Sequence, residues 1–478
     1  MKFLLRSTAL ISSAATLALA APSPRDVVLA RIDESKAAAD VIALKIWGFA
    51  EVGYKERQSS ALLQEQLKAA GFTVEAGVAG MPTAFVASFG RGSPVIGILG
   101  EYDALPGFSQ DASPEKKPIP GLAAGHACGH HLFGAASAQA TIAVKEWMQA
   151  TGQAGTIRFY GTPAEEGGAG KVHMVKAGLF ADVAAVLHWH PDSQNSVTMA
   201  PSQANKNGKF RFHGIASHAA MSPELGRSAL DAVNAMNHMV DMMREHVPQE
   251  TRLHYIITRG GDAPNVVPAF AESYHYVRHR DPEQVRATWD RLVKTAEGAA
   301  LGTGTTASWE VLGGVYDLLP NEILGRVMHA NLTQVGGVTY DAAEREFAQK
   351  IGRTLFGQPL APELAALIQP FNAHEPPQMG STDVGDVSWN VPTMGISTAT
   401  WVPGTPAHSW QAVACGGTTI GLKGMNVAAK VLALTCLDLF SQPQLLAEAR
   451  AEFDRRRGPG FKYVPLLGNR GPALNYRD

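Results

Sequence analysis

The sequence predicts an α/β protein, in which a mainly parallel sheet carries helices on both faces and a smaller α+β domain is inserted. Three observations support this prediction. Short apolar runs alternate with helical patterns between about residues 84 and 189. The pattern changes between about residues 205 and 313, and helices and a strand-like run return after residue 314. With 478 residues, the chain is long enough for two or three domains.

The N-terminus has the three parts of a secretory signal peptide. Lys2 and Arg6 precede an apolar run over residues 9–20, which ends in the small residues around Ala20. The run has 12 residues and contains hydroxyl side chains, whereas a membrane span needs about 20 apolar residues. We therefore expect residues 1–20 to be a signal peptide that is cleaved after Ala20. The mature chain is then secreted or periplasmic, with no membrane association.

The first part of the mature chain predicts two helices and then an alternation of strands and helices. Residues 26–72 show apolar pairs at helical spacing, such as Val28 with Ile32, and the pattern stops at Gly71. Strand and helix patterns follow over residues 84–89, 95–99, 132–148, 156–160, 172–177 and 183–189. Strands that alternate with helices in this way indicate a mainly parallel sheet covered on both faces.

Residues 205–313 predict the inserted domain. Strands are expected at 209–214, 253–258, 271–277 and 308–312, and helices at 228–245 and 282–299. This β-α-β-β-α-β order is typical of an open-faced sandwich. Residues 21–204 and 314–478 would then form the first domain, which continues through helices near 322–335, 341–352 and 363–367, a strand at 394–401 and a helix at 425–439. The last 24 residues, from Arg455, lack periodicity and are expected to form an extended tail on the surface.

Charge and cysteine content exclude some functions. The chain has 41 basic and 43 acidic residues, a net charge of −2, and losing Lys2 and Arg6 with the signal peptide takes it to −4. Without a basic excess, the chain is not expected to bind nucleic acid. Three cysteines are too few for a disulfide framework, so Cys128 needs another explanation.

The first chemical motif is the run G-H-A-C-G-H-H at residues 125–131. Cys128 and His130 flank Gly129, whose backbone freedom allows the loop to bend so that both side chains reach one point. A thiolate with an imidazole suits zinc and is compatible with manganese or iron. The alternative is that these are solvated histidines beside a buried cysteine.

The second motif, G-T-P-A-E-E-G-G at residues 161–168, follows a predicted strand and precedes a helix. The adjacent carboxylates Glu165 and Glu166 would repel each other unless a cation lies beside them, and one could then bind metal while the other moves a proton. A pair of glutamates on a solvated face is the ordinary alternative.

Other candidate residues also follow predicted strands. Asp103 comes after the strand at 95–99, and His408 after the strand at 394–401. His188 and His190 end the strand at 183–189 and point to the same side, so either could reach a metal; we prefer His190, nearest the strand's end. Because carboxyl ends of parallel strands meet at one edge of the sheet, we expect these groups to gather there.

Together these motifs resemble the two-metal aminoacylase and carboxypeptidase amidohydrolases, and in particular the branch that cleaves amino-acid conjugates. The resemblance lies in H-A-C-G-H at 126–130, G-T-P-A-E-E at 161–166, S-H-A-A at 217–220 and the late His408. Within the branch, members acting on an aromatic acyl-glutamate such as p-aminobenzoyl-glutamate are the most similar, through G-H-A-C-G-H-H-L-F-G at 125–134, W-H-P at 189–191, G-R-S-A-L-D-A at 226–232 and S-T-D-V-G-D-V-S-W at 381–389.

The resemblance implies a zinc-peptidase-like catalytic domain and an inserted domain that serves as a lid or in dimerisation, so that a homodimer is expected. It implies two divalent ions, Mn²⁺ or Zn²⁺, held by Cys128, His130, Glu166, His190 and His408. Glu165 would be the general base, and Asp103 the carboxylate that orients a neighbouring ligand.

Three residues of the inserted domain complete the implied site. His218 would reach the developing oxyanion across a dimer or on lid closure, although a surface loop histidine is the ordinary alternative. Asn265 and Arg227 are candidates to hold the carboxylate of the N-acyl amino acid substrate. Two features depart from the branch: His131 stands where relatives often have Asp or Asn, and His188 is an additional histidine beside the expected ligand.

The expected reaction is amide hydrolysis by metal-activated water. A dipeptidase or carboxypeptidase acting on true peptides would have the same metal core. A relative that binds ligand without catalysis is a second alternative, and the intact Glu165, Glu166 and His218 oppose it. A serine hydrolase is disfavoured because no G-x-S-x-G motif occurs.

Overall fold

The computed structural model describes residues 23–477. The signal peptide predicted at residues 1–20 lies outside the described residues. The larger domain is built on a six-stranded sheet in the order β1-β2-β6-β3-β7-β12. Its strands are β1 (Thr73–Ala76), β2 (Phe85–Arg91), β3 (Val95–Gly100), β6 (Gly155–Gly161), β7 (Ala185–Asp192) and β12 (Thr393–Ala399).

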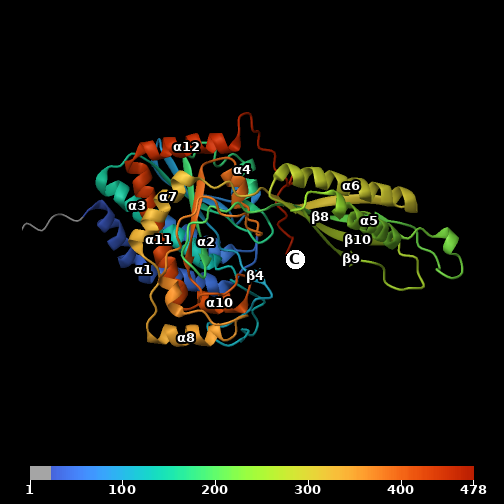
Figure 1. Cartoon of the computed structure of the whole chain (residues 1–478), viewed down its shortest axis with the longest axis horizontal. Coiled ribbons are helices and arrows are strands. Elements are labelled where there is room, and N and C mark those ends of the chain that lie inside the picture. The colour runs from blue at the N-terminus through green and yellow to red at the C-terminus, as the bar shows by residue number, and fades with distance from the viewer. Residues whose placement is uncertain (1–22, 478) are drawn as a thin grey trace, which may run out of the picture.

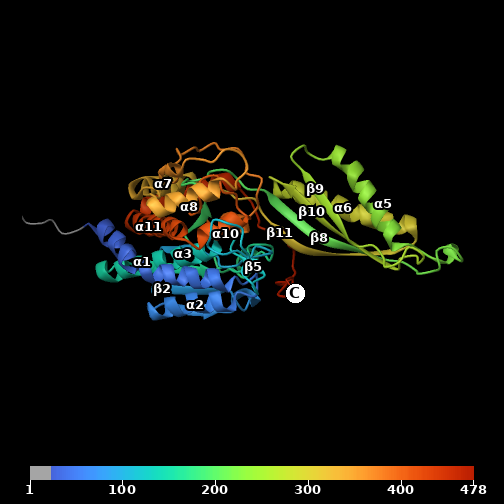
Figure 2. The ribbon, with the colours of Figure 1, turned by 90° about the horizontal axis from the view of Figure 1, so that it is seen from below.

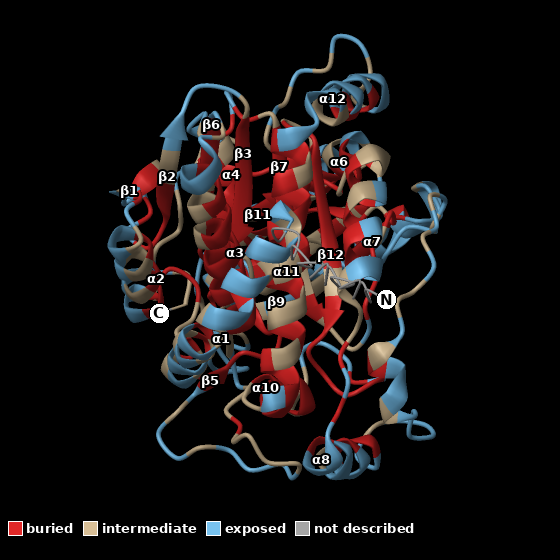
Figure 3. Cartoon of the chain, turned by 90° about the vertical axis from the view of Figure 1, so that its left-hand side faces the viewer, coloured by how far each residue is buried: buried red, intermediate tan, exposed pale blue. Residues whose placement is uncertain are grey.

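Four of the six strands are parallel, which confirms the predicted mainly parallel sheet. β6, β3, β7 and β12 run in one direction, whereas β2 pairs antiparallel with both β6 and β1. All six residues of β3 are buried, so both faces of the sheet are covered. Figure 3 shows β3 and β7 in the buried centre of the domain, with exposed segments around them.

Three long helices pack against one another beside this sheet: α1 (Pro24–Phe49), α3 (His130–Thr151) and α11 (Thr419–Ser441). α11 is apolar and long enough to cross a membrane, but 78% of its most apolar window is buried inside the protein. It is therefore explained as a core helix. The other helices of the domain are α2 (Arg57–Ala69), α4 (Gly170–Lys176), α7 (Glu322–Val335), α8 (Ala342–Gly352), α9 (Val384–Ser388), α10 (Trp410–Gly416) and α12 (Pro443–Arg457).

A separate antiparallel domain contains the other large sheet, with the strand order β11-β8-β10-β9. Its elements follow the predicted β-α-β-β-α-β order: β8 (Ala204–His213), α5 (Ala229–Met243), β9 (Arg252–Arg259), β10 (Phe270–His279), α6 (Pro282–Thr303) and β11 (Thr306–Val315). α5 and α6 pack on each other and on the sheet. Figures 1 and 2 show this domain extending away from the larger one.

The C-terminal segment differs from the expected surface tail. In the described part of the segment beyond α12, up to residue 477, there is no helix or strand, as predicted, but Leu466 is fully buried in the core of the antiparallel domain. Tyr476 packs against the core of the larger domain. Figure 1 shows the segment running from α12 along the junction of the two domains. Periodicity could not reveal this burial, because Leu466 packs in the core of one domain and Tyr476 against the core of the other.

Candidate metal centre

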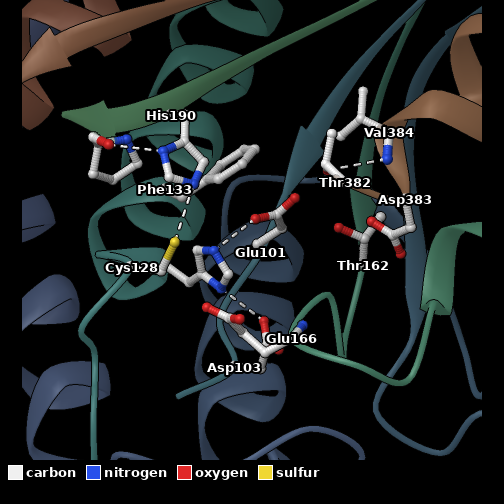
Figure 4. Close-up of polar contacts among 12 residues, drawn as sticks. Glu101, Asp103, Cys128, Phe133, Thr162, Glu166, His190, Thr382, Asp383 and Val384 are labelled. Atoms are coloured by element: carbon white, nitrogen blue, oxygen red, sulfur yellow. Dashed lines mark hydrogen bonds and ion pairs between the residues drawn. The ribbon is translucent and has the colours of Figure 1, made fainter. Parts of the chain in front are cut away.

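The predicted site residues gather at the carboxyl edge of the parallel strands. Glu101 and Asp103 directly follow β3, Glu165 and Glu166 follow β6, and His190 lies near the end of β7. The loop after β12 brings in His408. Figure 4 shows Cys128, His190, Glu101, Asp103 and Glu166 converging from these separate segments. The topology therefore places residues that are far apart in sequence around one centre.

Gly129 allows the Cys128 loop to turn into α3. Its φ of 75° lies in the left-handed region, and a Cβ at this position would lie 2.6 Å from Cβ of Pro191. This turn directs Cys128 and His130 toward His190. Cys128 Sγ lies 3.4 Å from His190 Nε2, and ligand atoms of all three residues lie within 4.8 Å of one another.

A second group of potential ligands adjoins the first and shares Cys128 with it. Atoms of Cys128, Glu166 and His408 lie within 4.8 Å of one another, and His408 Nε2 is 3.2 Å from Glu166 Oε1. The backbone of His408 is held in place because its N–H donates to the carbonyl of Ala127 at 2.9 Å. The five predicted ligands thus form two groups with a common sulfur atom.

The histidines direct their Nε2 atoms toward this centre. His130 Nδ1 lies 2.8 Å from Asp103 Oδ1, and His190 Nδ1 lies 2.7 Å from the carbonyl of Pro191. Each Nδ1–H is the donor in its contact, which leaves Nε2 as the free ligand atom. His131, by contrast, points away and donates from Nε2 to the carbonyl of Gly416 at 3.0 Å. The contact of Asp103 with Nδ1 fixes the orientation of the His130 ring.

Unsatisfied buried atoms show that this donor set fits a cation. His130 Nε2, Glu166 Oε1 and Glu101 Oε2 are buried and make no hydrogen bond within the described chain. Buried carboxylate oxygens and imidazole nitrogens that face one another are costly unless a positive charge, such as a bound ion, lies between them. Thiolate, imidazole and carboxylate ligands suit Zn²⁺ and are compatible with Mn²⁺.

Asp103 and Glu56 hold the loop that bears the two glutamates. Asp103 Oδ2 accepts the N–H of Glu166 at 2.9 Å, and Glu56 Oε1 accepts the N–H of Ala164 at 2.8 Å. Burial disfavours charge on Asp103, but His130 and the hydrogen bond from Glu166 N–H hold its pKa below the ordinary value. Burial and Asp103 raise the pKa of Glu56 to about 8. The backbone of the loop is therefore fixed from two sides.

Glu165 has the environment of a residue that exchanges protons. Burial, followed by the carboxylates of Glu101 and Glu166, raises its pKa well above the ordinary value. A carboxyl group with a raised pKa can accept a proton from water and hold it for a later transfer. Burial also raises the pKa of the Cys128 thiol, so its deprotonation has to be coupled to binding of a cation.

Two adjoining cavities of about 310 and 530 Å³ open at this centre, and both are lined by Glu165, Glu166 and His408. The smaller one extends past His188 and residues 395–397. The larger one opens toward the antiparallel domain, where Arg278 lies over the ring of Tyr276 and donates to Ser381 Oγ at 3.4 Å. Arg278 was missed from the sequence because its closeness to the site depends on how the domains pack.

The structure separates His188 from the ligand groups. Its ring lines the smaller cavity, and its Nε2 has no hydrogen-bond partner among residues 23–477. Burial and His190 lower the pKa of His188 to about 3, so the ring is neutral. A Cβ on Gly395 would lie 2.4 Å from this ring, so the glycine makes room for it.

His218, Arg227 and Asn265 lie at the other end of the antiparallel domain. Ala204 and His213 bound the ten residues of β8, whose nine steps of about 3.3 Å span about 30 Å. His218 pairs with Val266, and the carbonyl of Asn265 accepts the N–H of Ala219 at 3.0 Å. These three residues are therefore near one another and do not reach the metal-ligand groups of their own chain.

Glu101, Lys171 and Asp383 were not predicted as site residues. Lys171 Nζ lies 2.7 Å from Glu101 Oε1 and 2.6 Å from Asp383 Oδ1. Glu101 was open to detection, since it precedes Asp103 by two residues after the same strand and so points to the same side. The pairing of Lys171 with Asp383 spans 212 positions and leaves no local signal.

The fold and the paired ligand groups define a metal-dependent hydrolase. The model of the family described as Peptidase family M20/M25/M40 matches residues 97–433, and the chain belongs to this family. This membership confirms the resemblance stated from the motifs.

Two relatives match nearly the whole chain. One subunit of the p-aminobenzoyl-glutamate hydrolase of Escherichia coli K12 is 42% identical over 458 residues, which cover 90% of this chain and 95% of that protein. The Xaa-Arg dipeptidase of Mus musculus is 29% identical, over 88% of this chain and 90% of that protein.

Solved structures agree with the fold. A dinuclear metal-binding peptidase of the M20 family from Bacillus subtilis has a TM-score of 0.57 at 18% identity, covering 86% of this chain and 99% of that chain. The aminobenzoyl-glutamate utilization protein of Klebsiella pneumoniae has a TM-score of 0.58 at 17% identity, covering 82% and 96%. At this level of identity the two structures support the architecture alone.

Proposed function

We propose that this enzyme cleaves the amide bond of an N-acyl amino acid, and that its substrate is an aromatic acyl-glutamate such as p-aminobenzoyl-glutamate. The observation that supports amide hydrolysis is the position of Glu165 beside two ligand groups that share Cys128. The choice of substrate rests on the 42% identity to the p-aminobenzoyl-glutamate hydrolase of Escherichia coli.

Cys128, His130 and His190 would hold one divalent ion, and Cys128, Glu166 and His408 a second. Bound ions of this kind acidify water and polarise a carbonyl group. Glu165 accepts the proton of the attacking water, because its surroundings favour the protonated carboxyl group. Glu165 then returns this proton to the departing amine, and no covalent intermediate with the protein is needed.

The two cavities offer separate places for the two halves of the substrate. Arg278 supplies a cation in the larger cavity, beside the amides of Asn205 and Asn207, and is suited to hold a carboxylate of the amino-acid half. The smaller cavity, lined by His188 and Phe133, is then left for the acyl half. Arg227 and Asn265 lie far from this centre in the same chain, so they would bind substrate from a second subunit or after closure of the antiparallel domain.

The test is hydrolysis of p-aminobenzoyl-glutamate by the metal-stripped mature protein, before and after Mn²⁺ or Zn²⁺ is added. Activity that returns with a metal supports the proposal, and the rates show which of the two ions serves better. A protein that binds two ions but leaves this substrate intact would contradict the choice of substrate and retain the metal centre.

Peptide hydrolysis is a second candidate, because the Xaa-Arg dipeptidase matches most of the chain. The two candidates are separated by the ratio of kcat/KM for p-aminobenzoyl-glutamate and for a dipeptide that ends in arginine. Arg278 favours the acidic substrate, since a cation at this place repels an arginine side chain.

Export and dimerisation belong to the same proposal. We infer that the protein acts outside the cytoplasm after cleavage behind Ala20, which an N-terminal sequence beginning at Ala21 in the exported protein would support.

We further infer that a homodimer forms through the antiparallel domain, because His218 lies too far from the centre of its own chain.

A further inference from the structure

Glu101 is a buried carboxylate that the five-ligand set leaves out. Its exposed fraction is 1% and that of His130 is 0%, and Glu101 Oε2 lies 3.1 Å from His130 Nε2. Neither atom makes a hydrogen bond within the described residues. Because Nδ1 of His130 contacts Asp103, Nε2 is the atom that faces Glu101. A buried carboxylate and an imidazole nitrogen in this arrangement need a positive charge between them, and a bound metal ion supplies it when it replaces the proton.

The spacing of the two atoms matches that of the other ligand pairs. The facing atoms of Glu166 and His408 are 3.2 Å apart, and those of Cys128 and His190 are 3.4 Å apart. Bonds of roughly 2.0 to 2.3 Å place two ligands of one ion roughly 3 to 3.6 Å apart. The separation of 3.1 Å between Glu101 and His130 falls within the same interval.

A buried ion pair fixes which oxygen of Glu101 faces the centre. Lys171 Nζ contacts the other oxygen, Oε1, at 2.7 Å, and Asp383 holds Lys171 through both its ammonium group and its backbone N–H, at 2.6 and 2.9 Å. Lys171 is fully buried, so this lysine cannot turn away into solvent. Glu101 is therefore oriented with Oε2 toward His130 and Glu165, whose ligand atoms lie within 4.8 Å of it.

We propose that Glu101 is an additional metal ligand, which binds the same ion as His130, and that Lys171 and Asp383 are positioning residues that hold it there. The proposal rests on the metal centre and not on the choice of substrate. It also explains part of the motif at residues 381–389, since Asp383 belongs to this run and connects it to the site.

The test measures metal binding directly. Metal-stripped wild-type protein, Glu101→Gln and Asp386→Asn are titrated with Zn²⁺ and Mn²⁺ in competition with a chelator of known affinity. Asp386→Asn is the matched control, because Asp386 is a fully buried aspartate of the same motif whose oxygens contact Tyr316 N–H and Tyr463 Oη instead of Lys171. We expect Glu101→Gln to weaken one ion by tenfold or more, and the control to change neither ion by more than about threefold.

Glu101→Gln removes one ionic partner of the buried Lys171, which destabilises the fold. The double variant Glu101→Gln with Lys171→Met also removes the lysine charge, so it separates this effect from loss of a metal ligand. Circular dichroism and the unfolding midpoint of each metal-free variant establish that it is folded. If a folded Glu101→Gln or double variant binds both ions with wild-type affinity, Glu101 is only a partner of Lys171 and the inference is wrong. If the wild type itself binds no metal, the proposed function fails as well, so the two failures are distinguishable.

Discussion

At the scale of single residues, one variant tests whether Glu165 acts as the general base and not as a metal ligand. Glu165→Gln preserves the size of the side chain but cannot accept a proton. We expect kcat to fall by about 10² to 10⁴-fold, while both ions stay bound, because Glu165 is outside the two groups formed with Cys128. Steady-state rates and metal content per chain measure the two effects. Unaltered turnover would refute the assignment of the base and would leave a different group to move the proton.

The two histidines of β7 provide a matched pair of variants. His190 Nε2 faces Cys128, whereas His188 lines the cavity and takes no part in the ligand groups. We expect His190→Ala to weaken binding of one ion at least tenfold and His188→Ala to retain both ions, as measured by metal content after dialysis against a weak chelator. The reverse result would show that the two residues exchange roles.

The sequence predicts those residues of the site that directly follow a strand or a glycine-rich turn. Cys128, Glu166 and His408 each follow a local signal, a glycine-rich turn or the end of an apolar run, and the parallel topology brings such ends together. Arg278 and Asp383 left no such signal, because one depends on domain packing and the other on a lysine distant in sequence.

At the scale of elements, α9 contains a buried acid that makes stability depend on pH. Burial raises the pKa of Asp386 to about 7, whereas the unfolded chain loses this proton near a pH of about 4. Asp386 therefore holds its proton in the folded state between these values, so its contribution to the free energy of unfolding falls as the pH rises from about 4 to about 7. We expect Asp386→Asn to remove this negative contribution from the slope of the free energy of unfolding against pH, as measured by urea unfolding at several pH values.

The matched control for this prediction is Asp262→Asn, which changes an exposed aspartate and is expected to leave the slope as it is. Asp317 and Glu56, whose pKa values are raised to about 8, contribute with the same sign. The variant should therefore remove only a part of the dependence. An undiminished slope in Asp386→Asn would show that this carboxyl group is ionised in the folded protein.

Variants of the C-terminal segment test whether a segment without periodicity stabilises the protein. Leu466 is fully buried in the core of the antiparallel domain, whereas the neighbouring Val464 is 53% exposed. We expect Leu466→Ala to lower the free energy of unfolding by about 2 to 5 kcal/mol and Val464→Ala to change it by less than about 0.5 kcal/mol. Equal effects in denaturant titrations would mean that the tail detaches in solution.

At the scale of the whole molecule, the antiparallel domain presents its far end to solvent with apolar side chains exposed. Ile215, Met221, Leu225, Ile256 and Val266 are 45 to 81% exposed there, and β9 is an edge strand of the sheet. Exposed apolar side chains in a domain with an open edge strand are typical of an interface. His218 lies in the same region and pairs with Val266, so a contact between two such surfaces would place it near a second chain.

If His218 acts in the site of the second subunit of a dimer, two inactive variants should restore each other. The Glu165→Gln chain lacks the base but keeps His218. The His218→Ala chain keeps the base and an intact metal centre. After unfolding and refolding together, half of the dimers contain both chains and each has one complete site, so about a quarter of wild-type activity should return. Each variant refolded alone is the control, and sedimentation establishes that dimers have formed. Mixed dimers that stay inactive would mean that His218 reaches its own site by closure of the antiparallel domain, or takes no part in the reaction.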